Sequence, residues 1–217
     1  MNGFYFIAGR LLYEYNNFDA FKRDVKGRVI ELGNNEFFGT GHVIYKECFF
    51  YHLQNSNKIV KYNITSGKVE GKITFKNAQY SGSDSHLYKN EYDYFDLAVD
   101  ENGLWVIYGP NEMDDEMFVS KIDPGTLDVE KTWTLNVTHR SYGNGFISCG
   151  ILYLVRDTRA KLTEIDFGYD LYEKQRLRLN LRFRNPFQMN NMIAYNPKEK
   201  QIYSWDKGNQ LTYPLRV

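Results

Sequence analysis

Bulky apolar pairs recur along the chain at nearly even intervals, and stretches in which apolar and polar residues alternate recur with similar steps. The pairs are Phe49-Phe50, Leu104-Trp105, Leu152-Tyr153 and Ile202-Tyr203. A second series ends each alternating stretch on a turn residue, at Tyr62-Asn63, Ile122-Asp123, Tyr169-Asp170 and Tyr213-Pro214. Steps of about 50 residues are typical of a ring of four-stranded sheets, because every sheet repeats a similar strand at a similar depth.

This pattern predicts four sheets, or blades, over residues 41–75, 94–136, 144–183 and 189–217. The last blade shows only three strands. Phe4–Ile7 and Leu11–Tyr15 are candidates to complete it or to form a remaining blade, and residues 17–25 are the one helix-like segment. We therefore predict one all-β domain over residues 1–217, a five-bladed β-propeller of four-stranded antiparallel blades.

Composition supports the class and limits the partners. Aromatic residues make up 17% of the chain, which suits pleated sheets. Lys plus Arg (27) balances Asp plus Glu (27), so no overall field favours nucleic acid. No apolar run approaches the length of about 20 residues that a membrane span needs. The triplets at Asn63 and Asn136 are N-glycosylation sequons, which fit a secreted protein.

Equivalent positions of successive blades converge on the axis of a propeller. Eight residues before each apolar pair, these positions are Gly41, Asp96, Asn144 and Ala194. Aspartate and asparagine supply the hard oxygen ligands that Ca²⁺ prefers, so a cation on the axis is one hypothesis. The alternative is that Asp96 and Asn144 accept hydrogen bonds from backbone N–H groups in turns.

Two surface segments are candidates for binding. The polar stretch 76–93 is the longest predicted loop, and it is either a functional surface or filler. The strand 176–184 alternates leucine or phenylalanine with Arg176, Arg178, Arg182 and Arg184. These arginines either form a solvated outer face that deters edge pairing or bind a sulfated glycan or an acidic partner.

Several stretches resemble the olfactomedin domain. They are Gly39–Tyr45, Asn57–Tyr62, Tyr94–Tyr108, Asn144–Tyr153 and Tyr195–Asp206, of which the run Phe-Asp-Leu-Ala-Val-Asp-Glu-x-Gly-Leu-Trp ending at Trp105 is highly specific. The closing stretch Gly208–Pro214 is similar to the gliomedin and olfactomedin-like branches. The resemblance implies a five-bladed propeller, secreted or on a cell-surface ectodomain, that acts in adhesion, matrix organisation or receptor binding and has no enzyme activity.

The resemblance also implies a metal site. It makes Asp96 the carboxylate ligand of calcium, Asn144 the amide ligand, and Gly145 and Ile193 the donors of backbone carbonyls. Many members have a second aspartate where this chain has Ala194, whose methyl group offers no oxygen. We expect calcium to bind more weakly here, so that sodium, water or an empty site competes with it.

The family pattern begins with a strand that contains a cysteine, and that strand is not found before Phe4, so the chain is either truncated or divergent at its start. Cys149 stands where the family bonds to this early cysteine, and we expect a free thiol there. Cys48 and Cys149 lie in blades two apart, too distant to bond to each other.

The sequence therefore predicts an extracellular protein-interaction module. Its expected partner is an extracellular protein or receptor ectodomain, and oligomerisation would come from segments outside this chain. The histidines show no metal-ligand spacing and no nucleophile motif appears, which argues against an enzyme. Two alternatives stay open. One is a calcium-dependent, lactonase-like propeller hydrolase, and the other is a degenerate propeller that acts only as a folded spacer.

Overall fold

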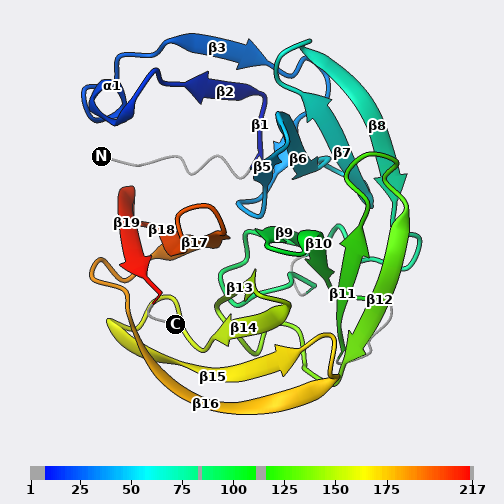
Figure 1. Cartoon of the computed structure of the whole chain (residues 1–217), viewed down its shortest axis with the longest axis vertical. Coiled ribbons are helices and arrows are strands. Elements are labelled where there is room, and N and C mark those ends of the chain that lie inside the picture. Colours follow the sequence, from blue (N-terminus) through cyan, green and yellow to red (C-terminus); the bar gives the residue numbers. More distant parts are fainter. Residues whose placement is uncertain (1–7, 83–84, 111–115, 216–217) are drawn as a thin grey trace.

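The chain folds into a ring of antiparallel sheets, seen in Figure 1 along its shortest axis. The computed structural model describes residues 8–82, 85–110 and 116–215, and in these residues it contains six sheets and one short helix. Sheets that follow one another in sequence lie next to each other around the ring, and the first strand of each blade lies nearest the centre. The arrangement is that of a β-propeller.

Three blades have four strands each. The first contains β5 (Val43–Tyr45), β6 (Cys48–His52), β7 (Lys58–Asn63) and β8 (Lys68–Thr74). The second contains β9 (Phe95–Asp100), β10 (Gly103–Tyr108), β11 (Met117–Ile122) and β12 (Val129–Leu135). The third contains β13 (Asn144–Ser148), β14 (Ile151–Val155), β15 (Leu162–Asp170) and β16 (Gln175–Arg184). Eleven of these twelve strands fall inside the ranges predicted from the sequence, and β16 ends one residue beyond its range, at Arg184.

Two tight turns show why the strands pair in this register. Lys46 and Glu47 both have positive φ, of 48° and 62°, as two-residue hairpin turns require. Cys149 and Gly150 do the same between β13 and β14, with φ of 52° and 77°. A Cβ atom on Gly150 would lie 2.6 Å from the ring of Tyr172, so only glycine fits at that position.

The remaining blade and the N-terminal sector are smaller. The C-terminal blade has three strands, β17 (Asn190–Asn196), β18 (Gln201–Asp206) and β19 (Asn209–Pro214). The N-terminal sector has β1 (Ala8–Gly9), β2 (Leu11–Glu14), α1 (Phe18–Lys22), β3 (Arg28–Glu31) and β4 (Phe37–Phe38). No helix in the described part of the chain has the length and hydropathy of a membrane span.

The propeller class is confirmed, but the predicted count of five four-stranded blades is not. In place of a fifth blade, the N-terminal sector holds two separate ladders, β2 with β3 and β1 with β4. Leu11–Glu14 pairs only with Arg28–Glu31 among the described strands, because α1 returns the chain at once as a hairpin. Asn17 caps that helix, and its side-chain oxygen accepts from the Ala20 N–H at 2.9 Å. The predicted strand Phe4–Ile7 lies outside the described residues.

Candidate functional site at the hub

The first strands of three blades, β9, β13 and β17, pack together at the centre of the ring. Asp96 lies near the start of β9 and is buried, as are Asn144 and Gly145 at the start of β13 and Ile193 on β17. The strands that carry the predicted axial positions Asp96, Asn144 and Ala194 therefore lie together at the hub, although Ala194 itself is only half-buried. Gly41 allows this approach, because a Cβ atom there would lie 2.6 Å from the Cα of Asp96.

Tyr88 joins Asp96 to the neighbouring blade. Its hydroxyl donates to Asp96 Oδ2 at 2.8 Å, and a Cβ atom built on Gly145 would lie 3.0 Å from the same hydroxyl. Tyr88 is fully buried, although it belongs to the polar segment 76–93 that we expected on the surface. The polar composition of the segment hid this role, because Leu87, Tyr88 and Asp93 lie within it and yet have almost no exposure.

A second network, of hydrogen bonds, connects residues at the starts of the inner strands β5, β9, β13 and β17. Asp93 Oδ1 accepts from the backbone N–H of Thr40 at 2.6 Å and of Gly41 at 2.8 Å, and its Oδ2 accepts from Thr40 Oγ1 at 2.8 Å. Thr40 Oγ1 also lies 2.6 Å from the carbonyl oxygen of Asn191, to which Asn144 Nδ2 donates at 3.4 Å. The sequence analysis missed Asp93, although its position three residues before Asp96 places it at the same end of β9.

The two aspartates at the hub are hard to ionise together. Burial raises the pKa of Asp93 to about 6, against the hydrogen bonds from Thr40 and Gly41. Burial also raises the pKa of Asp96 well above its usual range, and the negative charge of Asp93 raises it further while the Tyr88 hydrogen bond opposes both. A cation at the hub would relieve this cost.

The candidate ligands are oxygen atoms, which suit a hard cation, but few of them carry negative charge. Asp96 and Asn144 contribute carboxylate and amide oxygens, although Asn144 Oδ1 already accepts from the Gly145 N–H at 2.8 Å. No group of three His, Cys, Asp or Glu side chains gathers anywhere in the described residues. Ala194 lines a pocket beside the hub and contributes no oxygen. The residues thus suit calcium or sodium, with fewer carboxylates than a tight calcium site has.

The two cysteines lie in different surroundings, and neither is bonded to another cysteine. Cys48 is buried in the first blade. Cys149 is exposed, and both its N–H and its thiol donate to Glu101 Oε2, at 3.1 and 3.4 Å. Glu101 Oε1 accepts from the Tyr195 hydroxyl at 2.6 Å, so this carboxylate links the second, third and fourth blades.

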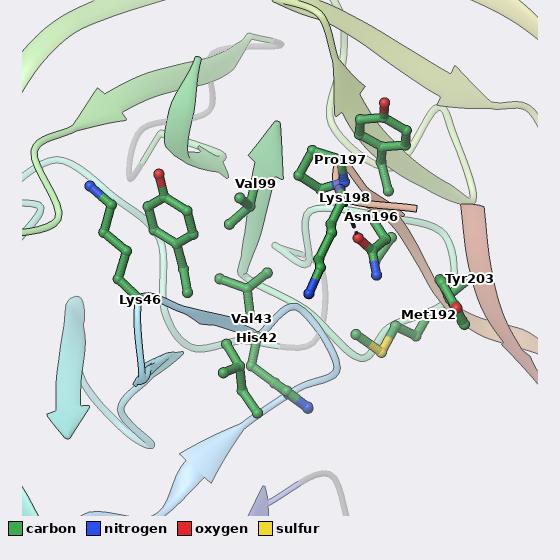
Figure 2. A pocket seen from close by; sticks show the side chains of 13 residues that line it. His42, Val43, Lys46, Val99, Met192, Asn196, Pro197, Lys198 and Tyr203 are labelled. Atoms are coloured by element: carbon green, nitrogen blue, oxygen red, sulfur yellow. Dashed lines mark hydrogen bonds between the residues drawn. The ribbon is translucent and has the colours of Figure 1, made fainter. Parts of the chain in front are cut away.

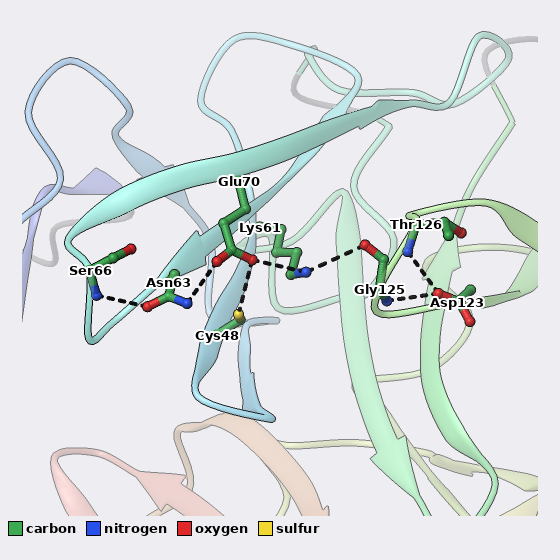
Figure 3. A network of polar contacts seen from close by, with 8 residues as sticks. All are labelled: Cys48, Lys61, Asn63, Ser66, Glu70, Asp123, Gly125 and Thr126. Carbon is green, nitrogen blue, oxygen red and sulfur yellow. Dashed lines mark hydrogen bonds and ion pairs between the residues drawn. The ribbon is translucent and has the colours of Figure 1, made fainter.

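The two predicted glycosylation sites differ in their hydrogen bonding. Asn63 belongs to the polar network of Figure 3, in which its Nδ2 donates to Glu70 Oε1 at 2.7 Å and its Oδ1 accepts from the Ser66 N–H at 2.8 Å. Lys61 continues that network to the next blade through the carbonyl of Gly125, at 3.4 Å. Asn136 is exposed directly after β12. Of the two, Asn136 has the side chain that is open to a glycan.

The arginine strand is β16, the outer strand of the third blade. Arg176, Arg178, Arg182 and Arg184 are all exposed. The guanidinium of Arg176 stacks 5.1 Å from the centre of the Phe167 ring, and Arg182 lies opposite Glu164 in the ladder. These four arginines therefore form an outer face, but one that an acidic side chain interrupts.

Comparison with known proteins agrees with this fold. The model of the olfactomedin-like domain family matches residues 2–217. Myocilin of Canis lupus familiaris is 32% identical over 208 residues, which are 96% of this chain and 43% of that protein. The adhesion G protein-coupled receptor L1 of Mus musculus is 33% identical over 187 residues, 83% of this chain and 13% of that protein.

The chain thus spans about two fifths of the myocilin that it matches, and much less of the receptor. Among solved structures, Kuenenia stuttgartiensis hydrazine synthase aligns with a TM-score of 0.40 at 15% identity, over 73% of this chain and 38% of that chain. A likeness this weak carries no functional meaning.

Proposed function

Because the chain belongs to the olfactomedin-like domain family, we propose that it is an extracellular protein-interaction module that acts in adhesion, matrix organisation or receptor binding. The family match over residues 2–217 is the observation that carries this proposal. The mouse relative is named as an adhesion receptor, which supports a place on a cell surface or in the matrix. A rigid ring with exposed outer strands and loops suits binding to a protein ectodomain.

The test is capture of extracellular proteins by the purified chain. We expect saturable binding to at least one member of an array of matrix proteins and receptor ectodomains, by surface plasmon resonance. A folded spacer would capture nothing. A lactonase-like hydrolase would instead open lactone rings when calcium is added, and that activity without any capture would replace this proposal.

Sulfated glycans are the second proposed partner class, through Arg176, Arg178, Arg182 and Arg184. Aligned guanidinium groups suit sulfate, and the contact would weaken as salt increases. Reversing all four charges to glutamate should abolish retention on heparin at low salt, whereas reversing Lys72 and Lys131, exposed on other blades, should change it little. Unchanged retention of the β16 variant would remove this part of the proposal.

For the hub, we propose a structural cation, calcium or sodium, held by the Asp96 carboxylate, the Asn144 amide and the carbonyls of Gly145 and Ile193. The support is the burial of Asp96 beside a second carboxylate, which makes its charged form costly. When bound, the ion supplies positive charge and a link between the inner strands. Asp96 then stays ionised, and Tyr88 fixes its orientation by donating to Oδ2.

Calcium-dependent melting tests this site. The Tm of the wild-type chain should be higher in calcium than in chelator, since a ligand of the folded state alone stabilises it. Asp96→Ala should lose that difference and Ala194→Asp should enlarge it. Asp19→Asn, on the exposed face of α1, is the matched control and should behave as wild type. Equal Tm values with calcium and with chelator for all four proteins would contradict a calcium site.

A further inference from the structure

The blade β17–β19 has one face that the described residues leave partly uncovered. Met192, Ala194 and Tyr203 line a pocket of about 490 Å³ there, which residues of β5 and β9 border as well. The same three residues line a second pocket of about 170 Å³, which continues along the strands to Trp205. None of the hydrophobic clusters formed by the described residues includes these three side chains.

The larger pocket is apolar at its base. Val43 of β5 and Val99 of β9 stand opposite Met192 of β17, so that strands of three blades contribute to it (Figure 2). Its volume is within the range of about 300–1,000 Å³ that ligand sites occupy. Apolar side chains that bind in the pocket would gain about 25 cal/mol of free energy for each Å² of apolar surface that they bury.

Two exposed lysines give the pocket its charge. Lys46 and Lys198 are lining residues, and no carboxylate is among the side chains that line it. The Lys46 ammonium lies 5.2 Å from the centre of the Tyr45 ring, and neither lysine forms an ion pair with another described residue. Glu199, which follows Lys198 in the sequence, accepts the hydroxyl of Tyr203. The pocket therefore complements a ligand that is apolar along its length and anionic at one end.

Free backbone edges border the same space. Among the described strands, β5 pairs only with β6 and β17 pairs only with β18. Each therefore has one edge outside its ladder. On β17, Asn190 and Asn191 already bond to Thr158, Thr40 and Asn144, and an extended segment can pair with the part of the edge beyond them by strand addition. A small molecule would use the pocket but neither the free edges nor the extension toward Trp205.

We propose that the two pockets together bind one extended peptide segment of a partner protein, with apolar side chains at alternate positions and acidic residues at the end that lies by Lys46 and Lys198. This inference rests on the proposed interaction function and states the chemistry of the partner. The alternating side chains occupy the face around Met192, Ala194 and Tyr203, and the carboxylates meet the two ammonium groups.

Trp205 provides a reporter of occupancy. It is 40% exposed beside the second pocket, whereas Trp105 and Trp133 are 0% and 5% exposed. The probe is a terminally blocked octapeptide of alternating valine and threonine that carries two glutamates at one end. Its matched control carries two lysines instead. We expect a saturable change in tryptophan emission with the glutamate peptide, and binding of the lysine peptide that is weaker by about tenfold.

Charge reversal at the two lysines distinguishes binding at this site from nonspecific binding of the peptide. The double variant Lys46→Glu with Lys198→Glu should bind the lysine peptide better than the glutamate peptide. Arg182→Glu, on the exposed face of β16, should keep the wild-type preference. Calorimetry provides a readout that does not depend on Trp205. Equal affinity of the wild type for both peptides, or a glutamate preference that survives in the double variant, would overturn the proposal.

The ectodomain capture described above distinguishes this proposal from the broader one. Capture that is lost in the double variant, together with glutamate-peptide binding, supports both. Capture that continues unchanged refutes this binding site and leaves the interaction module standing. Sedimentation provides the remaining outcome, because a wild-type dimer that the double variant dissociates would make the occupant a second copy and overturn the peptide assignment.

Discussion

Two seams between neighbouring parts of the ring differ sharply. The seam between β9–β12 and β13–β16 is filled by a large cluster in which Trp105, Trp133 and Leu154 are all buried. Tyr172, from the turn between β15 and β16, reaches across it to lie 6.2 Å from the Trp105 ring and 6.4 Å from the Trp133 ring. Here two complete four-stranded faces meet and exclude water. We call this the closed seam.

The seam between β17–β19 and the N-terminal sector, the open seam, is different. The ring contact recorded across it joins Phe21 of α1 to Trp205 at 6.4 Å, and the face beneath borders the two pockets. Two-stranded ladders such as β2 with β3 are too narrow to cover a whole blade face. The comparison shows that stability and binding capacity lie in different seams: the closed seam holds the ring together and the open seam leaves a surface to be occupied.

The largest expected effect is the difference in stability lost when one side chain in each seam is truncated to alanine. Trp105→Ala should lower the free energy of unfolding by about 3–5 kcal/mol, because it leaves a cavity in the closed seam. It also removes the 2.7 Å hydrogen bond from the indole to Asp100. Met192→Ala, on the open seam, should lower it by about 1 kcal/mol or less, since that side chain is only half-buried. Urea unfolding of both variants measures the difference.

Trp105→Phe keeps this comparison measurable if the alanine variant does not fold. Its ring still fills much of the site but gives up the bond to Asp100, so its loss should fall between those of the other two variants. Equal losses for Trp105→Phe and Met192→Ala would show that the two seams are packed alike, against the pocket geometry.

The next effect is a dependence on pH. Burial lowers the pKa of His52, in contact with Phe95 at 4.6 Å, to about 4, and it lowers the pKa of His42, beside the open seam, to about 4. Unfolded histidine titrates near 6.5, so the unfolded chain takes up more protons between these values. Stability contributed by the two neutral rings is thus complete above pH 6.5 and decreases as the pH falls toward 4, by about 3 kcal/mol at most for each ring.

Urea unfolding at pH 7 and pH 5 checks this effect. His52→Gln should reduce the loss of stability between pH 7 and pH 5. Titration of the rings by NMR should find both histidines neutral at pH 5. A His42 pKa near 6 with His52 still near 4 would show that water fills the open seam, and would sharpen the contrast. A His52 pKa near 6 would contradict the burial of its ring against Phe95, between the first and second blades.

Much of the fold could be predicted because local signals agreed with the tertiary pairing. Alternation located the strands, and the turn residues that follow Tyr62, Ile122 and Tyr169 marked the ends of β7, β11 and β15. The fifth blade was predicted wrongly because the apolar run Leu11–Tyr13 indicates that a strand exists but not how many partners it finds. Strand pairing across a ring depends on distant segments, and a single sequence does not reveal these.

The site was predicted where the repeat gave its positions. Asp96 and Asn144 are buried on inner strands that pack together at the hub, because equivalent places in successive blades meet near the axis. For β17 the spacing indicated Ala194, whereas the family resemblance indicated Ile193. Asp93 and Tyr88 have no equivalent in the other repeats, so spacing could not find them. They enter the hub from an irregular segment whose polar composition resembles that of a surface loop.

The smallest expected effect comes from adding volume instead of removing it. Ala98→Leu places a larger side chain in the closed seam, where Ala98 is 9% exposed and lies opposite Trp105 in the ladder, and should cost about 1–3 kcal/mol by overpacking. Ala194→Leu makes the same change opposite Tyr203, in the open pocket, and should be neutral or stabilise by up to about 1 kcal/mol. Paired urea titrations measure both. A similar cost at the two positions would mean that the open seam is already filled in solution, and the distinction between the seams would fail.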